Sequence, residues 1–450
     1  MVRLTFYGGV NEIGGNKILL EDKKTRIFLD FGLSFSFHAK FFTGYLHPRG
    51  INELGDQLEF NLLPKMKGLY SEDYLTNTGI AYESPKVDGV LLSHAHIDHV
   101  GAFHYLDQDI PVWLGETALT ILKALAESGG YDFGKHQTHT FRTGCEFEIG
   151  SMRIEPIHVD HSIPGAYGFI IYTSEGVVVY SGDLRAHGPM EKMTSEFVDK
   201  AQEADPVVML CEGTRIDPVV QRDAYSERDV LNKSMSVVKK SSGLVISSFY
   251  GRDIDRFNTF HKIVKDAGRK FVISLKAAYL LSKLESDPKL RVPRLGDDVL
   301  VYAKRKRSGT YRDSDYFPWE RKFLNKAVGY DYVKQNQNKL ILNLDLPNFT
   351  ELVDIRPAAG GDFIHSMSEP FSEEDIDAEV MLNWLNHFGL KFHQIHASGH
   401  ASGRDLAAIV KRIQPKILIP VHTEHANAFR NLAEEKTEVR IPSRNEAIVI

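Results

Sequence analysis

Four candidate metal ligands stand within six residues of one another, directly after a buried apolar run. The run VDGVLL at 87–92 predicts a strand in the interior of a sheet, and the motif SHAHIDH at 93–99 follows it. One regular helix or strand could not direct all four side chains to one place, whereas a strand-to-helix turn could. Imidazole and carboxylate groups suit Zn²⁺ or Mn²⁺. The motif therefore predicts a divalent-metal site rather than a chance surface cluster, with candidate ligands His94, His96, Asp98 and His99.

Three further candidate ligands each come just after an apolar strand. They are His161 in VDHSIPGA, Asp183 in VVVYSGD and His422 in ILIPVHTE. Taken alone, a histidine at a strand end is more often a hydrogen-bonded structural residue than a ligand. Together with the motif at 93–99, these three side chains complete two coordination spheres. The sequence therefore predicts two divalent ions, zinc in the first place and manganese as the alternative.

Strand-like and helical patterns alternate over most of the chain. Residues 87–183 predict strands and helices that would build a layered α/β sandwich. HVGAFHYLD at 99–107 predicts the start of a helix, and residues 34–86 show no clear period and predict an irregular insertion or lid. A second α/β series then follows. Later helices are expected near 226–241, over 253–267 and over 403–413.

A chain of 450 residues is too long for one ordinary hydrophobic core, so two domains are expected. We find no internal repeat and no low-complexity linker that would divide the chain. The simplest architecture is one α/β domain, residues 1–208 and 392–450, interrupted by a second α/β domain at 209–391.

Charge and cysteine content narrow the class of protein. A net charge of −6 argues against a generally basic nucleic-acid binder, although a local basic groove remains compatible with it. The two cysteines, Cys145 and Cys211, are too few for a disulfide framework and favour a reducing compartment. The first residues do not resemble a secretory signal, and no stretch is long and apolar enough for a membrane span. We therefore expect a cytoplasmic protein without a membrane partner.

The ligand motifs and their order resemble the metallo-β-lactamase superfamily, which implies an αββα sandwich. Glu212 in CEGT, His400 in HASGHASG and His422, with a long α/β insert between the first two, resemble motifs A, B and C of the β-CASP nucleases. GGVNEIGGN, LPKMKGLY and HSIPGA are similar to the archaeal branch of the ribonuclease J family. The resemblance implies a sandwich with an inserted β-CASP domain, and a homodimer is one expectation.

The resemblance also assigns roles to the candidate ligands. It implies that one metal is held by His94, His96 and His161, and the other by Asp98, His99 and His422. Asp183 would bridge the two metals. Asp30 in FLDFG would support the site from its edge, because ligating histidines need outer partners that fix their orientation.

A histidine at motif C is typical of the RNA-cleaving members, so the resemblance implies RNA as the substrate. It also implies that the loop around His400 holds the 5′-monophosphate of the RNA, which would make the protein a 5′→3′ exoribonuclease with a preference for 5′-monophosphorylated RNA. Endonuclease activity is left open. Catalytic roles are expected for His400, Glu212 and Asp98: His400 would protonate the leaving 3′-oxygen, Glu212 would orient that histidine, and Asp98 would act as a metal ligand.

Small residues around His400 predict an anion-binding loop that leads into a helix. Ser398, Gly399 and Ser402 are the expected contacts to a 5′-phosphate. A simple helix cap at Ser402 is the alternative, and both roles are compatible. Arg256, with Phe249 before it, is a further candidate for a phosphate contact, equally readable as part of a helix start.

Three other functions are weighed against the exonuclease. An endonuclease in RNA 3′-end processing or on DNA would use the same ligands, although His422 argues against the DNA version. A small-molecule metallo-hydrolase would not need the long insert or His400. An inactive homologue is expected to lose ligands, and every expected ligand is present in this sequence.

Overall fold

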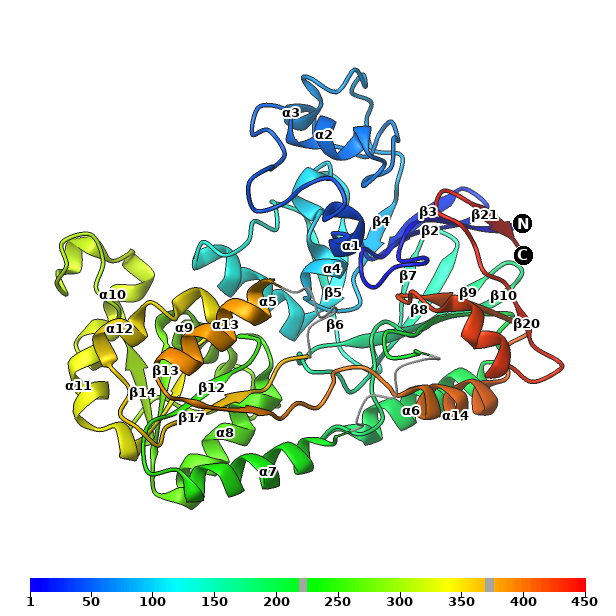
Figure 1. Ribbon diagram of the computed structural model, residues 1–450. Coiled ribbons are helices and arrows are strands. Elements are labelled where there is room, and N and C mark those ends of the chain that lie inside the picture. Colours follow the sequence, from blue (N-terminus) through cyan, green and yellow to red (C-terminus); the bar gives the residue numbers. More distant parts are fainter. Residues whose placement is uncertain (218–224, 369–375) are drawn as a thin grey trace. The chain divides into compact units, whose positions relative to one another are not determined.

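The computed structural model describes residues 1–217, 225–368 and 376–450, which form two compact units (Figure 1). The first unit comprises Met1–Lys123, Tyr131–Arg222 and Gly399–Ile450, and the second comprises Ala124–Gly130 and Asp223–Ser398. The predicted domain boundaries, at 208/209 and 391/392, differ from the limits of these two units. The reason is local: the strand Val208–Glu212 pairs with strands of the first unit, and Lys391–Gln394 pairs with a strand of the second.

Two seven-stranded sheets build the first unit. In spatial order, the first sheet contains β21 (Ala447–Val449), β1 (Val2–Gly8), β2 (Lys17–Asp22), β3 (Thr25–Leu29), β4 (Gly89–Leu91), β5 (Val112–Gly115) and β6 (Thr138–Phe141). The second contains β20 (Glu438–Val439), β19 (Ile417–Val421), β11 (Val208–Glu212), β10 (Gly176–Tyr180), β9 (Tyr167–Thr173), β8 (Met152–His158) and β7 (Phe147–Ile149). Because β1 pairs with β21, the two ends of the chain lie in neighbouring strands (Figure 1).

The two sheets pack face to face. Leu4 and Phe6 of β1 share one hydrophobic core with Phe169 of β9 and Leu210 of β11. The opposite face of the second sheet is covered by α6 (Glu191–Glu203) and α14 (Gly403–Ile413), which lie side by side (Figure 1). Since β11 is covered on both faces, all five of its residues are buried. The predicted αββα sandwich is confirmed.

The other helices of the first unit are short, except for α5 (Glu116–Glu127). They are α1 (Phe35–His38), α2 (Glu53–Glu59), α3 (Glu72–Leu75), α4 (Ile97–Val100), η1 (Phe103–Tyr105), η5 (Ala426–Asn431) and the longer α5, whose last residues are counted in the second unit. The helix expected from residue 99 onward is thus only a short turn. The carbonyl of His99 accepts the N–H of Phe31, so it does not serve a continuing helix. The segment 34–86 contains only short helices, as its lack of period predicts.

A parallel seven-stranded sheet forms the second unit. Its spatial order is β15 (Ala327–Val328), β14 (Val299–Tyr302), β13 (Lys270–Ser274), β16 (Leu340–Asn343), β12 (Val245–Ser248), β17 (Asp362–His365) and β18 (Lys391–Gln394). Its helices are α7 (Glu227–Lys240), α8 (Ile254–Ala267), α9 (Leu275–Leu284), η2 (Asp313–Asp315), α10 (Pro318–Leu324), α11 (Tyr330–Gln335), η3 (Gln337–Lys339), η4 (Leu346–Asn348), α12 (Glu351–Ile355) and α13 (Ile376–His387). The helices expected near 226–241 and over 253–267 are therefore confirmed within a few residues.

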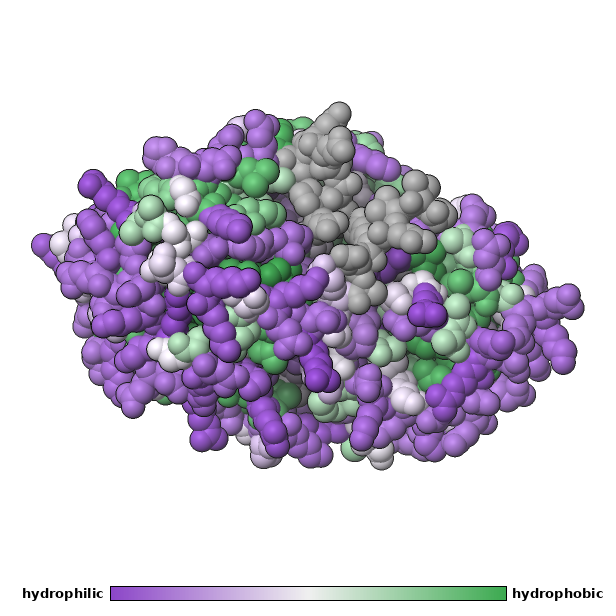
Figure 2. All heavy atoms as spheres, turned by 60° about the horizontal axis from the view of Figure 1, so that its bottom comes forward, coloured by the Kyte–Doolittle hydropathy of each residue, from purple (hydrophilic) through white to green (hydrophobic). Residues whose placement is uncertain are grey.

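Hydrophilic residues cover most of the coloured surface on the face drawn in Figure 2, and hydrophobic residues form separate small patches there. Among the helices of the described ranges, none has the length and apolar character needed to cross a membrane.

Candidate metal centre

The seven predicted ligands converge in the first unit and form two groups that share one residue. In each group the ligand atoms all lie within 4.8 Å of one another. We call His94, His96, His161 and Asp183 the first ligand group, and Asp98, His99, Asp183 and His422 the second ligand group. This is the division that the resemblance implies, with Asp183 as the shared residue.

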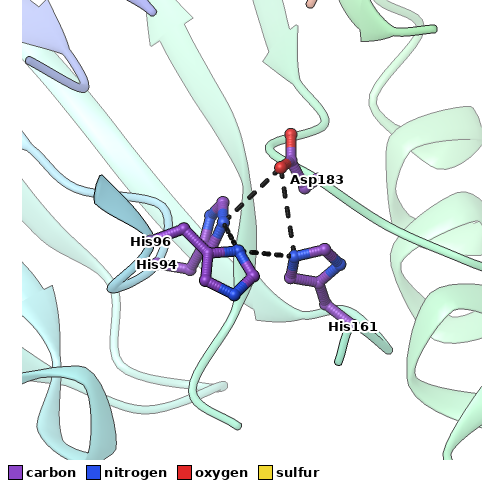
Figure 3. A group of neighbouring side chains, drawn as sticks. All are labelled: His94, His96, His161 and Asp183. Atoms are coloured by element: carbon purple, nitrogen blue, oxygen red, sulfur yellow. Dashed lines mark hydrogen bonds and ion pairs between the residues drawn. The ribbon is translucent and has the colours of Figure 1, made fainter. Parts of the chain in front are cut away.

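In the first ligand group three imidazoles and one carboxylate point toward one another (Figure 3). His96 Nδ1 lies 3.0 Å from His94 Nε2 and 3.1 Å from His161 Nε2. Asp183 Oδ2 lies 3.5 Å from His94 Nε2 and 3.9 Å from His161 Nε2. Burial lowers the pKa of His94 and of His161 well below the usual histidine value, so both rings are neutral and offer lone pairs.

The second ligand group is more acidic. His422 Nε2 lies 3.0 Å from Asp98 Oδ2, and His99 Nε2 lies 3.1 Å from Asp183 Oδ2. Burial alone would lower the pKa of His99, but the carboxylates of Asp183 and Asp30 outweigh it and hold that pKa well above the usual value. Burial is likewise outweighed at His422, where Asp183 and Asp98 raise the pKa.

The buried polar atoms of this cluster fit a cation. Within the described residues, both carboxylate oxygens of Asp183 and Nε2 of His99 lack a hydrogen-bond partner although they are buried. Burying an ionised carboxylate costs several kcal/mol unless a charge or a set of donors compensates it. Divalent cations between these oxygen and nitrogen atoms would provide that compensation, and the donor set matches zinc-binding chemistry.

The fold brings these side chains together because each ligand follows a strand. The motif at 93–99 follows β4, Asp183 follows β10, and His422 follows β19. Asp30, directly after β3, and His422 both have a positive φ, 56° and 55°, which L residues rarely adopt. Neighbouring backbone holds both conformations: the N–H of His422 donates to the Gly9 carbonyl at 2.7 Å, and the N–H of Asp30 donates to Leu91 at 3.0 Å.

Asp30 lies behind the second ligand group, as predicted. Its Oδ2 is 2.7 Å from Nδ1 of His99 and accepts the Tyr180 hydroxyl at 2.6 Å. The backbone N–H and the hydroxyl of Ser93 also donate to this carboxylate, at 2.7 and 2.8 Å. A carboxylate on the outer nitrogen of a ligating histidine fixes both the tautomer and the ring orientation.

The GGVNEIGGN segment, which carries the resemblance, also has a structural role at this centre. The N–H of Asn16 donates to the Asp98 carbonyl at 3.2 Å, and Gly9 accepts the N–H of His422. Gly14 has φ +75°, and a Cβ there would meet the Asp98 side chain at 2.6 Å. Glycine is therefore required where this loop passes Asp98.

His400 and Glu212 lie next to the ligand groups, as the sequence predicts. His400 Nδ1 is 3.5 Å from Glu212 Oε2 and 3.9 Å from Asp183 Oδ2, and its side chain is 19% exposed. Glu212 is fully buried, and its carboxylate accepts the N–H of Thr214 at 3.0 Å and of Ala401 at 3.3 Å. These bonds fix the carboxylate beside the histidine.

Thr214 is a residue that sequence reasoning missed. Its hydroxyl lies 3.0 Å from Nδ1 of His400 and 2.8 Å from Nδ1 of His422, so it contacts both rings. The only signal in the sequence is its place two residues after Glu212 in CEGT, and a threonine after a strand has many other uses.

Comparisons with known proteins agree with this geometry. Residues 73–218 match the family described as "Beta-lactamase superfamily domain", and residues 388–442 match "Zn-dependent metallo-hydrolase RNA specificity domain". Ribonuclease J of Mycoplasma genitalium is 26% identical over 444 residues, which cover 95% of this chain and 69% of that protein. Ribonuclease J of Helicobacter pylori strain 26695 is 23% identical, with 99% and 59% covered. The chain is a homologue of ribonuclease J.

A solved structure agrees in fold. The crystal structure of a protein of unknown function from Enterococcus faecalis V583 has a TM-score of 0.78 and 24% identity, and all of both chains is covered. Ribonuclease J of Synechocystis is 25% identical, and the matched part covers 98% of this chain and 63% of that protein. The chain thus spans about two thirds or less of the length of the ribonuclease J proteins named here.

In this ribonuclease J homologue, the loop predicted to bind phosphate is tied to the first ligand group. Nδ1 of His161 is 2.5 Å from the carbonyl of Gly399, and a Cβ at position 399 would meet the Ser162 hydroxyl oxygen at 2.7 Å. Ser402 caps α14, because its hydroxyl accepts the N–H of Asp405 and donates to the Asp405 carboxylate. The predicted helix cap is therefore present. Ser398 is the last residue of the second unit.

Arg256 has a different place from the one predicted. It is fully buried in the second unit, and its guanidinium donates to Glu227 at 3.0 Å and to the carbonyls of Ser366 and Ala397 at 2.8 and 3.1 Å. Phe249 is also buried and stacks on Phe260. These contacts argue against a phosphate contact by Arg256 and against a base stacking on Phe249.

Proposed function

We propose that the chain is a metal-dependent ribonuclease that removes nucleotides in the 5′→3′ direction from RNA with a 5′-monophosphate. The observation that carries this proposal is one carboxylate, Asp183, shared by two ligand groups beside His400. Homology to ribonuclease J and the match to an RNA specificity domain support RNA as the substrate.

We infer two divalent ions, zinc in the first place, one in each ligand group. Such ions activate water as a nucleophile and offset the charge of the reacting phosphate. The protein contributes the arrangement. Three histidines and Asp183 would hold one ion, and Asp98, His99 and His422 with Asp183 would hold the other. Asp98 would therefore contribute to catalysis by binding one of the metal ions.

His400 is the proton donor in this proposal. Hydrolysis adds an oxygen of water to phosphorus and breaks the bond to the 3′-oxygen, which must take up a proton as it leaves. His400 is partly exposed, so its ring can reach a bound phosphodiester, and the buried Glu212 carboxylate lies on its Nδ1 side. A carboxylate on that side orients the ring, and the proton would be delivered from Nε2.

The 5′-phosphate is assigned to the loop that leads into α14. The first N–H groups of a helix attract anions, and α14 is 11 residues long. Gly399 and Ser402 border this loop, and Ser398 precedes it in sequence. Holding the 5′ end near His400 would define which phosphodiester is cleaved. A homodimer stays a prediction of the resemblance, and the free Cys145 and Cys211 support a cytoplasmic location.

Incubation with end-labelled RNA tests the proposal. RNA with a 5′-monophosphate should release mononucleotides, RNA with a 5′-hydroxyl should be degraded at least about tenfold more slowly, and a chelator should abolish both reactions. His400→Ala should lose about a hundredfold or more of the rate, the usual contribution of a positioned acid. The exposed His47→Ala is the matched control and should behave as wild type. Cleavage that begins internally and ignores the 5′ group would make the exonuclease proposal wrong and favour an endonuclease.

A further inference from the structure

The Thr214 hydroxyl lies between two histidines that have different tasks. His422 belongs to the second ligand group, and His400 is the proposed proton donor. We propose that Thr214 is a positioning residue that fixes the His400 ring against His422, so that the edge of the ring that carries Nε2 is turned toward the substrate. This inference rests on the proposed function and adds a residue to it.

The tautomer of His422 follows from its surroundings. Nε2 faces the ligand group, 3.0 Å from Asp98 Oδ2 and 3.6 Å from Asp183 Oδ2. A neutral imidazole that offers the lone pair of Nε2 to a cation carries its hydrogen on Nδ1. That N–H therefore donates to the Thr214 hydroxyl oxygen at 2.8 Å. The hydroxyl is thus an outer partner of a metal ligand, as Asp30 is for His99.

The Thr214 hydroxyl can also form a hydrogen bond with His400, and it can do so in two ways. Its hydrogen can be donated to an unprotonated Nδ1 of His400 at 3.0 Å. When that nitrogen carries a hydrogen, the hydroxyl can accept from it and donate instead to the carbonyl of His422 at 3.4 Å. A hydroxyl both donates and accepts, so Thr214 stays bonded to the ring before and after a proton transfer.

The geometry turns Nδ1 of His400 inward. This nitrogen faces Thr214, Glu212 and Asp183, at 3.0, 3.5 and 3.9 Å. The opposite edge of the ring, which carries Nε2, is the edge that we propose faces the substrate. The backbone N–H of Thr214 donates to Glu212 at 3.0 Å, so the same residue also orients the carboxylate beside His400. That backbone bond does not depend on the side chain.

Two substitutions separate the hydroxyl from a purely structural role. Thr214→Val keeps the shape and the backbone bond to Glu212 but removes the hydroxyl, and Thr214→Ser restores the hydroxyl. Each variant is compared with wild type for bound metal, for hydrolysis of 5′-monophosphorylated RNA and for hydrolysis of bis(4-nitrophenyl) phosphate, whose leaving group needs no proton. A crystal structure of Thr214→Val gives the orientation of the His400 ring independently of activity.

With Zn²⁺ at a saturating concentration, we expect Thr214→Val to hold as much metal as wild type, to lose about ten- to a hundredfold of the rate on RNA, and to lose less than about threefold on the nitrophenyl ester. Its His400 ring should be rotated or displaced, and Thr214→Ser should stay within about threefold of wild type on both substrates. The double variant with His400→Ala should be no slower on RNA than His400→Ala alone.

Several results would overturn the inference: full activity of Thr214→Val on RNA, equal losses on both substrates, loss of metal even at saturating Zn²⁺, or an unmoved His400 ring. Failure of the proposed function is distinguishable from these, because wild type would then not degrade RNA. The ring orientation in the crystal structure would still decide the role of Thr214.

Discussion

The two ligand groups share Asp183 but are held in place by different means. In the first ligand group, Nδ1 of His161 meets a backbone carbonyl, that of Gly399, and Nδ1 of His94 lies 3.0 Å from the Ser93 hydroxyl. In the second, the outer partners are the Asp30 carboxylate and the Thr214 hydroxyl. The second ligand group therefore depends more on side chains, and substitution at Asp30 should affect it selectively.

The two ligand groups also differ in the pKa values of their histidines. Burial lowers the pKa of His94 and His161, whereas Asp183 with Asp30 or Asp98 raises the pKa of the second group's histidines above the usual value. One half of the centre consequently binds a cation with neutral rings. In the other half, His99 and His422 hold their protons more strongly, and a cation must displace them. Asp183 is the ligand that the two halves share.

The largest effect is expected for Asp183→Ala. Removal of the shared carboxylate takes one ligand from each group, so the variant should lose both ions and at least about a thousandfold of the rate on RNA. Bound metal is measured by mass spectrometry after gel filtration, and the rate on labelled RNA. Asp22→Ala, which removes another fully buried carboxylate of the first unit, is the control and should keep its metal. Two ions retained in Asp183→Ala would refute the sharing of Asp183.

A smaller and one-sided effect is expected for Asp30→Asn. The amide keeps the shape but loses the negative charge beside Nδ1 of His99, so the second ligand group should bind its ion about 10–100-fold more weakly. Affinity in the first ligand group should stay within about threefold, because Asp30 reaches His94 only indirectly, through the Ser93 hydroxyl. Titration with Zn²⁺ in a competing chelator resolves the two sites. Equal weakening of both would contradict the separation of the two groups.

The ligands could be predicted because each is marked locally: an apolar strand ends and a histidine or aspartate follows. Asp183 and His422 are such positions, and their convergence needs only the layered sheets that the alternation predicts. Arg256 shows where prediction from the local sequence pattern fails. A cation in the first turn of a helix has the same sequence pattern whether it faces solvent or, as here, lies under Ser366 and Ala397.

The domain limits and Thr214 were out of reach for related reasons. Whether the strand at 208–212 continues the first unit or opens the second depends on which neighbours it pairs with, β10 and β19, and this is a tertiary property. Thr214 matters because its hydroxyl lies between His400 and His422, residues far away in sequence. A hydroxyl with no charge and no ligand role leaves no mark of that position in the chain.

The smallest expected effect is a difference in protons released on metal binding. A raised pKa means that His99 and His422 hold a proton up to a higher pH than an ordinary histidine, and a cation must displace that proton. A lowered pKa means that His94 and His161 hold none to displace. The second ligand group should therefore release more protons than the first, and its affinity should fall more steeply as the pH falls.

Two single-site variants measure this difference. His161→Ala weakens the first ligand group and leaves the second to bind one ion, and His422→Ala does the reverse. Calorimetric titration with Zn²⁺ at pH 7, in two buffers that differ in ionisation enthalpy, counts the protons released by each variant. His161→Ala should release more, because its remaining group contains His99, whose pKa is raised by Asp183 and Asp30 against the effect of burial. Equal counts, or more protons from His422→Ala, would mean that the two halves do not differ in charge and that only their outer partners distinguish them.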